Sequence, residues 1–425
     1  MASSSTTTSS DKKPLLILIN PACGSRKATE FHDLHLLPYL KTHLPHAVVR
    51  TETTTHENHA GELIREYIQS SSSATDSLDV ILLSGDGTLH EIINIISTHV
   101  DSPLVQRTTH LNIALVPCGT ANAMYHTLFS KSSNEQGDAH KWMLHSVHSL
   151  LQSRTSSSNL SALRFSLTTF TSPTTPTPSA PAPAPSPISS AVVVSTSLHA
   201  AILHRSEDLR ASTPGLERFK IAAMESITRW YDARVVLRGT KVQRYCSGTR
   251  AFLDVPGGGE GKVIELEGPF AYFLSTTTCD RLEEEFVVAP LQSRIPAPPY
   301  GTKEFMDVVI VRPLRDPALQ AKGKEAKEQF AKRLGDVLMA AYKQGAHVDM
   351  KYEEAGEEVV EYYRCSGWEW IPASTDEYAH LVCTDGAITR IPAGGKVECG
   401  TVLGSVNDTA KEVGTGPAVE FRVYH

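Results

Sequence analysis

Three apolar segments in the first third of the chain each run directly into a loop of small residues, and this pattern limits the fold most. Residues 15–20 run into NPACGS, residues 78–83 into SGDGT, and residues 111–116 into PCGTAN. Helical spacing follows each loop. Repeated units of a short apolar strand, a tight loop and a helix are typical of a mostly parallel sheet covered on both faces. We therefore expect an N-terminal α/β domain.

The pattern changes beyond residue 155. Residues 171–190 read TSPTTPTPSAPAPAPSPISS, a proline-rich tract that can neither pair in a sheet nor continue a helix. We interpret this tract as a disordered surface insertion between two strands. The remaining apolar segments are short and strand-like, with helical stretches only at 216–231 and 322–343. The expected organisation is a disordered N-terminus over 1–13, an α/β domain over 14–155 and a β-rich domain over 156–425.

Composition excludes several classes of protein. The chain has 40 basic and 47 acidic residues, a formal charge of −7, which argues against a nucleic-acid-binding protein. Its apolar runs are too short to span a bilayer, and the N-terminus lacks the apolar core of a secretory signal. The 7 cysteines are scattered without a C-x-x-C pair, and the histidine pairs lack a third ligand. We expect a cytoplasmic protein with reduced thiols and no metal-ligating cluster.

The three small-residue loops point to a phosphate-bearing ligand. Loops at the carboxyl ends of parallel strands lie together, glycine lets a phosphate approach the backbone, and the following helix presents free N–H groups. The chain has neither a P-loop nor a dinucleotide fingerprint. Asp86 lies between two glycines of such a loop. A carboxylate beside phosphates is electrostatically costly unless it binds Mg²⁺ or takes a proton. Helix capping is the alternative, but three such loops favour a catalytic base for phosphoryl transfer to an alcohol.

The motifs SGDGTLHEIIN, NPACGSRKA, THENHAGEL and VPCGTANAM together resemble the catalytic domain shared by diacylglycerol kinases, sphingosine kinases and ceramide kinases. The resemblance covers residues 15–128. It implies a phosphofructokinase-like nucleotide-binding domain followed by a β-sandwich lipid-binding domain. It also implies ATP and Mg²⁺ as cofactors, a lipid substrate and peripheral membrane contact. The serine of SGDG favours the sphingosine kinase branch.

The resemblance also assigns roles to individual residues. Asp86 matches the position that activates the lipid hydroxyl. Arg210 and Arg218 match arginines that bind phosphate, a role that suits the guanidinium group. Surface ion pairs with Glu207 and Glu217 are the alternative for these arginines. The positions implied to contact ATP in the first domain are Asn20, Gly24, Ser25, Arg26, Lys27, Thr54, Ser84, Gly85, Gly87, Glu91, Gly119 and Thr120.

Some positions depart from the family pattern. Asp385 in TDGA matches a nucleotide or Mg²⁺ contact, with a plain turn residue as the alternative, but Ala387 replaces the glutamate of V-D-G-E. Cys23 replaces a loop glycine. The segment SLHAAILH, residues 197–204, lacks the aspartate that pairs with the lipid ammonium in sphingosine kinases. A sphingoid base is therefore the first expected substrate, only narrowly ahead of ceramide or diacylglycerol.

Two other functions remain open. NAD kinases and phosphofructokinases also carry a G-D-G-T loop, and they act on soluble substrates. The long β-rich half and the T-A-N-A sequence after Gly119 favour a lipid instead. A non-catalytic lipid-binding regulator would fit the departures from the family pattern, whereas the retained Gly85, Asp86 and Gly87 argue for an enzyme.

Overall fold

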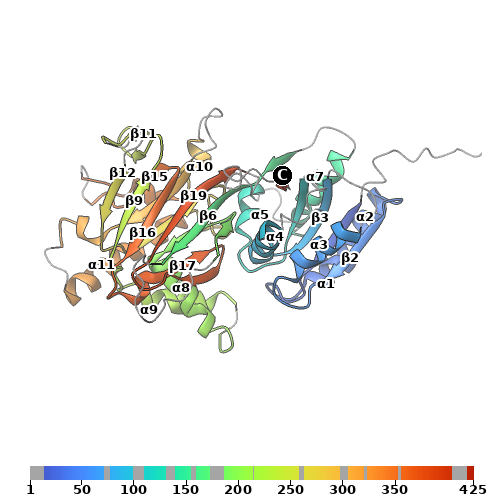
Figure 1. The fold of residues 1–425 in the computed structure, drawn as a ribbon, viewed down its shortest axis with the longest axis horizontal. Coiled ribbons are helices and arrows are strands. Elements are labelled where there is room, and N and C mark those ends of the chain that lie inside the picture. Colours follow the sequence, from blue (N-terminus) through green and yellow to red (C-terminus); the bar gives the residue numbers. More distant parts are fainter. Residues whose placement is uncertain are drawn as a thin grey trace, which may run out of the picture. The chain divides into compact units, whose positions relative to one another are not determined.

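The computed structural model describes residues 14–70, 77–98, 110–130, 139–154, 159–172, 186–213, 215–257, 263–296, 305–319, 323–352, 356–403 and 419–425. The expected disordered N-terminus and most of the proline-rich tract lie outside these residues. The chain divides into two compact units, unit 1 with Met1–Leu163 and Leu403–His425, and unit 2 with Arg164–Val402 (Figure 1). This division differs from the expected 14–155 and 156–425 because the end of the chain returns to unit 1.

Unit 1 is built on a six-stranded sheet with the order β2-β1-β3-β4-β20-β5. Neighbouring strands are parallel from β2 to β20, and only β5 is antiparallel. The mostly parallel sheet expected from the sequence is confirmed. The strands are β1 (Leu15–Ile19), β2 (Val49–Thr53), β3 (Ser77–Ser84), β4 (His110–Pro117), β5 (Leu160–Ala162) and β20 (Glu420–Tyr424).

Helices cover this sheet. Alternate strand residues such as Ile17 and Ile81 pack with Phe31 and Leu150 in one buried apolar cluster. The expected helices after the first three loops are present, whereas α6 and α7 were not expected, because histidine and serine interrupt their apolar spacing. The helices are α1 (Ala28–Phe31), the π-helix η2 (His32–Leu36), α2 (Leu37–His43), α3 (His59–Ser70), α4 (Asp86–Thr98), α5 (Ala123–Leu128), α6 (Ala139–Met143) and α7 (His145–Ser153).

The last strand is fixed to unit 1 by a buried polar cluster around Asp79. Its carboxylate accepts hydrogen bonds from Asn112 at 3.0 Å, Arg154 at 2.8 Å and the Tyr424 hydroxyl at 2.9 Å. The Asp79 and Arg154 side chains are 4% and 2% exposed. Because a buried charge is costly without partners, this cluster specifies where β20 pairs.

The strand order creates a switch point between β1 and β3. The chain leaves β1, forms β2 on one side of it, and then returns to form β3 on the other side. In open α/β sheets, ligands bind outside the carboxyl ends of the strands at such a point. The loops after β1 and β3 are therefore the place to look for a ligand site.

Unit 2 contains two sheets, with the orders β11-β10-β15-β14-β13-β8-β17-β18 and β12-β9-β16-β19-β6-β7. The strands of the first sheet are β8 (Val194–Thr196), β10 (Gln243–Cys246), β11 (Ala251–Asp254), β13 (Tyr272–Thr276), β14 (Met306–Val311), β15 (Glu361–Cys365), β17 (Leu381–Thr384) and β18 (Ala387–Arg390). Those of the second are β6 (Arg164–Thr171), β7 (Ile188–Ser190), β9 (Ala233–Arg238), β12 (Val263–Glu267), β16 (Gly367–Pro372) and β19 (Lys396–Leu403).

Aromatic side chains join the two sheets face to face. The ring of Phe273 on β13 lies 4.9 Å from Trp368 and 5.3 Å from Trp370, both on β16. These side chains are buried, so the expected β-sandwich is confirmed. The helices of unit 2 are α8 (Ser197–Asp208), α9 (Glu217–Ser226), α10 (Leu291–Arg294), α11 (Lys324–Ala341) and the 3-10 turns η5 (Pro313–Arg315), η6 (Ala346–Asp349) and η7 (Glu377–His380).

Strands β6 and β7 lie at the two ends of the proline-rich tract. They pair antiparallel, with Ser166 opposite Ser190 and Thr168 opposite Ile188. The tract therefore connects two paired strands, as the sequence predicted. The expectation that no part of the tract pairs in a sheet was wrong at its end, because its last residues, Ile188–Ser190, form β7. Among the described residues, no helix is both long and apolar enough to cross a bilayer.

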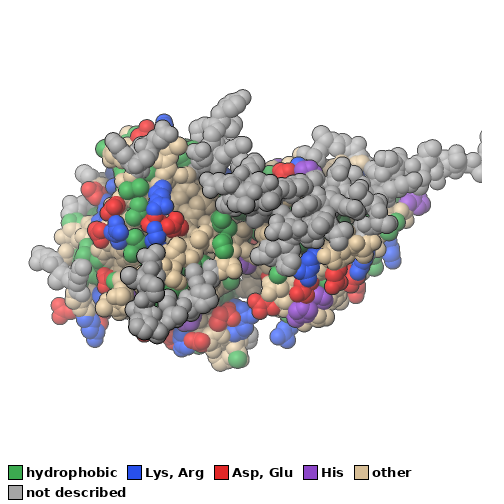
Figure 2. All heavy atoms as spheres, viewed as in Figure 1, with side chains coloured by type: hydrophobic (Ala, Val, Ile, Leu, Met, Phe, Trp, Pro, Cys, Tyr) green, Lys and Arg blue, Asp and Glu red, His purple; other side chains and the backbone are tan. Residues whose placement is uncertain are grey.

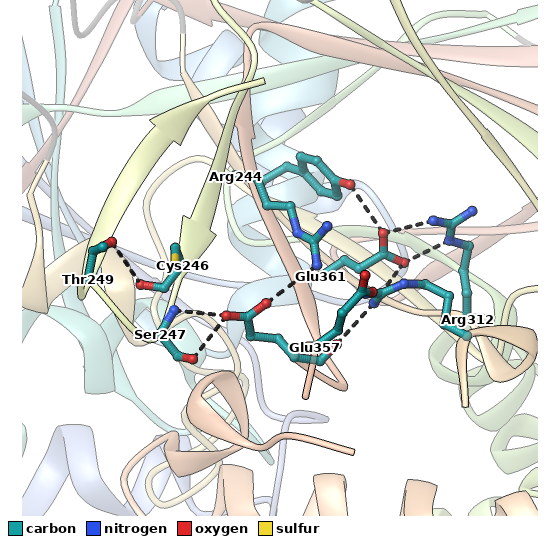
Figure 3. Close-up of polar contacts among 10 residues, drawn as sticks. Arg244, Cys246, Ser247, Thr249, Arg312, Glu357 and Glu361 are labelled. Carbon is teal, nitrogen blue, oxygen red and sulfur yellow. Dashed lines mark hydrogen bonds and ion pairs between the residues drawn. The ribbon is translucent and has the colours of Figure 1, made fainter. Parts of the chain in front are cut away.

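A polar network holds β15 to its neighbours in unit 2 (Figure 3). Glu361 accepts two hydrogen bonds from Arg312, at 2.7 and 2.8 Å. Burial alone would raise the pKa of Glu361, but the Arg312 guanidinium holds it below its usual value. Beside this pair, Ser247 donates to Glu358 from its backbone nitrogen at 3.0 Å and its hydroxyl at 2.9 Å. These contacts stabilise the sheet around β15, which lies between β10 and β14.

Candidate active site

The loops after β1, β3 and β4 meet through glycine. A Cβ atom on Gly85 would lie 2.8 Å from the Cα of Gly119, and one on Gly24 would lie 2.9 Å from the Gly119 carbonyl oxygen. Gly24 also has a φ of +48°, which favours glycine. Side chains at Gly85 and Gly119 would force the loops apart, so these glycines are required by the packing itself. The structure thus brings together the three loops that the sequence singled out.

Asn20 and Thr88 connect the two sides of the switch point. The Asn20 side-chain nitrogen donates to the Thr88 hydroxyl at 2.9 Å, and its oxygen accepts from the backbone nitrogen of Ala22 at 3.0 Å. Thr88 is buried in the first turn of α4. Asn20 therefore fixes the loop after β1 against the start of α4. The sequence had singled out Asn20 but not Thr88, since a buried threonine in a helix has no local signal.

Asp86 is the first residue of α4, yet its side chain reaches a different helix. Its Oδ2 accepts from the backbone nitrogen of Ala123 at 2.7 Å, and its Oδ1 accepts from that of Met124 at 3.1 Å. These are the first two N–H groups of α5, which have no partner within that helix. The expected alternative for Asp86 was a helix cap, and the structure does give it a capping role, but for α5. The carboxylate is held in one orientation between β3 and β4.

Asn122 is a site residue that the sequence reasoning missed. Its backbone has a φ of +53°, and its side chain both accepts from the nitrogen of Gly119 at 2.8 Å and donates to the Gly119 oxygen at 3.0 Å. The loop after β4 is therefore closed on itself beside Asp86. Asparagine tolerates the left-handed backbone region better than most residues, so an asparagine just before a helix was the available signal.

Gly87 differs from the other loop glycines. Among the described residues, nothing lies within 4 Å of a Cβ placed there, and its φ is not positive. Gly87 is exposed in the first turn of α4, a helix of 13 residues. The fold does not require glycine at this position. The missing side chain leaves room for a ligand at the start of the helix, where the Thr88 backbone nitrogen already donates to the Gly85 oxygen at 3.2 Å.

Exposed polar residues surround this surface. Ser25, Arg26 and Lys27 are exposed between β1 and α1, and Thr120 is exposed in the loop after β4. Arg26 has a φ of +62°. The two cations supply positive charge beside the glycine loops, as phosphate binding requires. Ser84, in contrast, is buried at the end of β3 and donates to the Gly85 oxygen at 3.1 Å.

Thr54 and Glu91 lie on the β2 side of the site. Thr54 is buried and its backbone nitrogen donates to the Ile19 oxygen at 2.8 Å. Glu91 on α4 accepts from the backbone nitrogen of Asn58 at 3.0 Å, and burial raises its pKa despite that bond. Both residues position the loop after β2, so their expected contact with ATP remains a prediction.

Cys23 and Cys118 lie in contact between the first and third loops. The Cys23 thiol donates to the Cys118 carbonyl oxygen at 3.3 Å. Burial raises the pKa of Cys23 to about 11 and that of Cys118 to about 12. Both thiols are therefore protonated at neutral pH, which favours a packing role over a reactive one.

Arg210 and Arg218 lie in unit 2 beside α8 and α9. Arg210 donates to Glu207 at 2.7 Å, and Arg218 lies 4.0 Å from the same carboxylate oxygen. Burial lowers the pKa of Arg218, and the nearby Arg210 lowers it further. Two guanidinium groups that share one carboxylate carry a net positive charge. The pair is thus partly engaged in the surface ion pairs considered above, with a positive charge left over.

Asp385 has a structural role in unit 2. It occupies the turn between β17 and β18 with a φ of +50°. Its carboxylate accepts from the backbone nitrogens of residues 191, 192 and 193 at 2.8, 2.9 and 2.8 Å. These bonds tie the segment between β7 and β8 to the turn. The arrangement favours the turn role over the expected nucleotide or Mg²⁺ contact.

Comparison with known proteins adds to this geometry. Residues 14–155 match the diacylglycerol kinase catalytic domain family. Human sphingosine kinase 2 is 31% identical over 111 residues, covering 26% of this chain and 15% of that protein. Mouse mitochondrial acylglycerol kinase is 28% identical over 124 residues, 29% of this chain and 26% of that protein. Human sphingosine kinase 1 is 28% identical over 123 residues, 29% of each protein.

These matches span less than a third of each relative's length. Among solved structures, a protein from Bacillus anthracis str. Sterne, described as a candidate diacylglycerol kinase, is 15% identical. The superposition covers 94% of this chain and 97% of that chain with a TM-score of 0.48.

Proposed function

Because residues 14–155 belong to the diacylglycerol kinase catalytic domain family, we propose that the protein is an ATP-dependent lipid kinase. It transfers the γ-phosphoryl group of ATP to the primary hydroxyl of a sphingoid base or a related lipid. The observation that carries this proposal is the meeting of Gly24, Gly85 and Gly119 at the switch point, with Asp86 held among them.

The phosphates of ATP would lie against the helix start at Gly87. No side chain fills the space at Gly87, and this surface lies at the positive end of α4. Arg26 and Lys27 add positive charge from the loop after β1. Phosphoryl transfer depends mainly on positioning and charge stabilisation, and these groups supply both.

Asp86 would orient the lipid hydroxyl and accept its proton. Each of its oxygens already accepts one N–H bond from the start of α5, and a carboxylate has further lone pairs for a hydroxyl donor. The two bonds fix the carboxylate before the substrate arrives, so little reorganisation is needed during the reaction. Asp86 is thus a base whose position is set by the third loop.

Two carboxylates that could approach Mg²⁺ are already engaged. Asp86, the expected base, and Asp385, the expected nucleotide or Mg²⁺ contact, both accept from backbone N–H groups. Among the described residues, no set of three or more histidine, cysteine, aspartate or glutamate side chains converges as a metal site. Magnesium would instead be bound mostly by the phosphates of ATP, and no step here depends on it.

A neutral lipid is a second candidate substrate, and the environment of α8 supports it. The helix begins within the carboxylate-free segment SLHAAILH, and burial lowers the pKa of His199 there to about 4. His199 is therefore neutral, with Nδ1 2.6 Å from the Ser195 hydroxyl oxygen. The two carboxylates of α8 are both paired, Asp208 with Arg205 at 3.3 Å and Glu207 with Arg210 at 2.7 Å. A lipid ammonium would find no unpaired carboxylate along this helix. Ceramide and diacylglycerol have no ammonium group and would not require one.

The test is phosphoryl transfer by the purified full chain with radiolabelled ATP. Sphingosine, ceramide and diacylglycerol serve as lipid acceptors, and NAD and fructose 6-phosphate serve as soluble acceptors. The proposal expects a labelled lipid and no labelled soluble product. Labelled NAD or sugar would favour a soluble-substrate kinase. Bound ATP without any labelled product would identify a non-catalytic regulator.

A further inference from the structure

Unit 1 contains a second hollow that shares no residue with the glycine loops. It is a groove of about 770 Å³ between η2 and α2 on one side and α6 and α7 on the other. We call it the histidine groove. Its lining residues are Leu34, His35, Pro38, Tyr39, Thr42, His43, His140, Lys141, Leu144, His145 and His148.

The groove has an unusual charge pattern. It is lined by five histidines and one lysine, and none of its described lining residues is acidic. The titratable groups that face it are His35 from η2, Tyr39 and His43 from α2, His140 and Lys141 from α6, and His145 and His148 from α7. Imidazole side chains change charge between about pH 5 and 8. The wall of the groove therefore gains positive charge as the pH falls.

The histidines contact aromatic rings instead of forming a metal site. The rings of His35 and His140 stack with centroids 3.8 Å apart, and the Tyr39 hydroxyl lies 2.9 Å from Nδ1 of His148. Among the described residues, no metal-binding cluster is formed. Two protonated imidazole rings in a stack repel each other, and an anion beside them offsets that repulsion. An anion bound in this groove would therefore favour the protonated histidines.

An apolar side chain adjoins the basic wall. Leu34 lines the groove and is 62% exposed, an exposure that has a free-energy cost in water. Pro38 and Leu144 add apolar surface. Figure 2 shows histidine side chains at the surface of unit 1. Cationic groups combined with an exposed leucine match the two layers of a membrane surface, anionic headgroups above and acyl chains below.

We propose that the histidine groove is a pH-dependent docking surface for an anionic membrane. Protonated imidazoles face the lipid headgroups, and Leu34 enters the acyl boundary. This goes beyond the proposed kinase function, because it concerns attachment of unit 1 to the bilayer and does not depend on catalysis. A soluble anion would use the charges but would gain nothing from Leu34.

The test is co-sedimentation of the full chain with vesicles of phosphatidylcholine containing phosphatidylserine, compared at about pH 6 and pH 7.5. Binding should be stronger at the lower pH, and it should weaken in high salt. The variant His140→Gln/His148→Gln removes two exposed charges. At about fivefold per charge, its binding at about pH 6 should fall about 25-fold. At pH 7.5 it should match the unmodified protein. Leu34→Gln should weaken vesicle binding at both pH values.

The matched control is His56→Gln/His59→Gln. These two rings also stack in unit 1, with centroids 4.4 Å apart, but they do not line the groove. The control should keep the full pH response, and so should Asp86→Asn, which separates docking from catalysis. An equal loss of response in the control and groove variants would overturn the proposal. Equal binding to vesicles of phosphatidylcholine alone, or dimer formation in place of vesicle binding, would also overturn it.

Discussion

The carboxylate of Asp86 holds the first backbone N–H of a helix that begins 37 residues later, with Oδ2 at 2.7 Å from the nitrogen of Ala123. One side chain thus has a structural role at α5 and a proposed chemical role at the substrate. The two roles are compatible, because each carboxylate oxygen can accept more than one hydrogen bond. They can be separated experimentally, since stability reports the first role and phosphoryl transfer the second.

Asp86→Asn should abolish phosphoryl transfer while leaving ATP binding nearly intact. Loss of a general base costs about 10²- to 10⁴-fold in rate. The amide nitrogen would also face a backbone N–H where an oxygen now accepts, so unfolding should require about 1–2 kcal/mol less free energy. Rate and urea unfolding are measured on the same preparation. The control Asn122→Gly loosens the same corner but keeps the carboxylate, and it should retain measurable transfer. Full activity in Asp86→Asn would refute the catalytic role.

Gly87→Ala and Gly85→Ala should fail in different ways. Alanine at Gly87 meets no described atom within 4 Å, and it is a better helix former, so stability should hold or rise by up to about 1 kcal/mol. Its methyl group would lie on the surface proposed for phosphate, so ATP affinity should fall. Alanine at Gly85 would lie 2.8 Å from Gly119 and should cost about 1–3 kcal/mol of stability. Calorimetric ATP titration and thermal unfolding distinguish them. Normal ATP affinity in Gly87→Ala would show that the phosphates bind elsewhere.

Much of unit 1 could be predicted from local sequence. Apolar runs defined β1, β3 and β4. The loop glycines were interpreted as room for a phosphate, whereas the structure also shows that Gly85 and Gly119 let two loops approach each other closely. The partner of Asp86 could not be predicted, because a hydrogen bond across 37 residues leaves no local pattern. The same holds for Asp385, whose three N–H donors lie nearly two hundred residues earlier.

Other features were hidden by composition. Histidine and serine break the apolar spacing of α7, although Val147, Leu150 and Leu151 are buried along it. Strand β20 follows a long segment without apolar periodicity, and its pairing with β4 and β5 shows that it belongs to unit 1. A strand's own residues do not reveal its neighbour, because many registers satisfy the same alternation.

Replacing residues 173–185 with a short Asn-Gly turn should leave folding and transfer unchanged. Strands β6 and β7 already pair antiparallel, with Thr168 opposite Ile188, and a tight turn suits such a pair. Thermal unfolding and the lipid kinase assay are the two measurements. A folded variant without activity would show that the proline-rich tract contributes to function.

Acid should destabilise unit 2 through His347. Its Nε2 donates to the Val288 oxygen at 3.1 Å, and burial lowers its pKa to about 4. The unfolded chain, with an imidazole pKa near 6.5, binds the proton more readily. The contribution of neutral His347 is therefore complete above about pH 6.5 and is lost as the pH falls towards 4. About 2 kcal/mol should be lost by about pH 5. Urea unfolding at about pH 6.5 and about pH 5 measures this loss of unfolding free energy, and His347→Gln should reduce its pH dependence. If the variant keeps the same pH dependence, groups other than His347 cause the loss.

The last strand should control the stability of the proposed nucleotide site. β20 pairs with β4, and β4 leads into the loop that holds Gly119. Tyr424→Phe removes the hydrogen bond to the buried Asp79 carboxylate and should cost about 2 kcal/mol. Arg422→Ala, on the same strand, loses a 2.7 Å ion pair with Glu420 in which both side chains are about 30% exposed, so it should cost under about 1 kcal/mol. Removing residues 419–425 should abolish ATP binding while the sandwich of unit 2 keeps its near-ultraviolet signal. Unaltered ATP binding after that truncation would show that β4 holds its loop without β20.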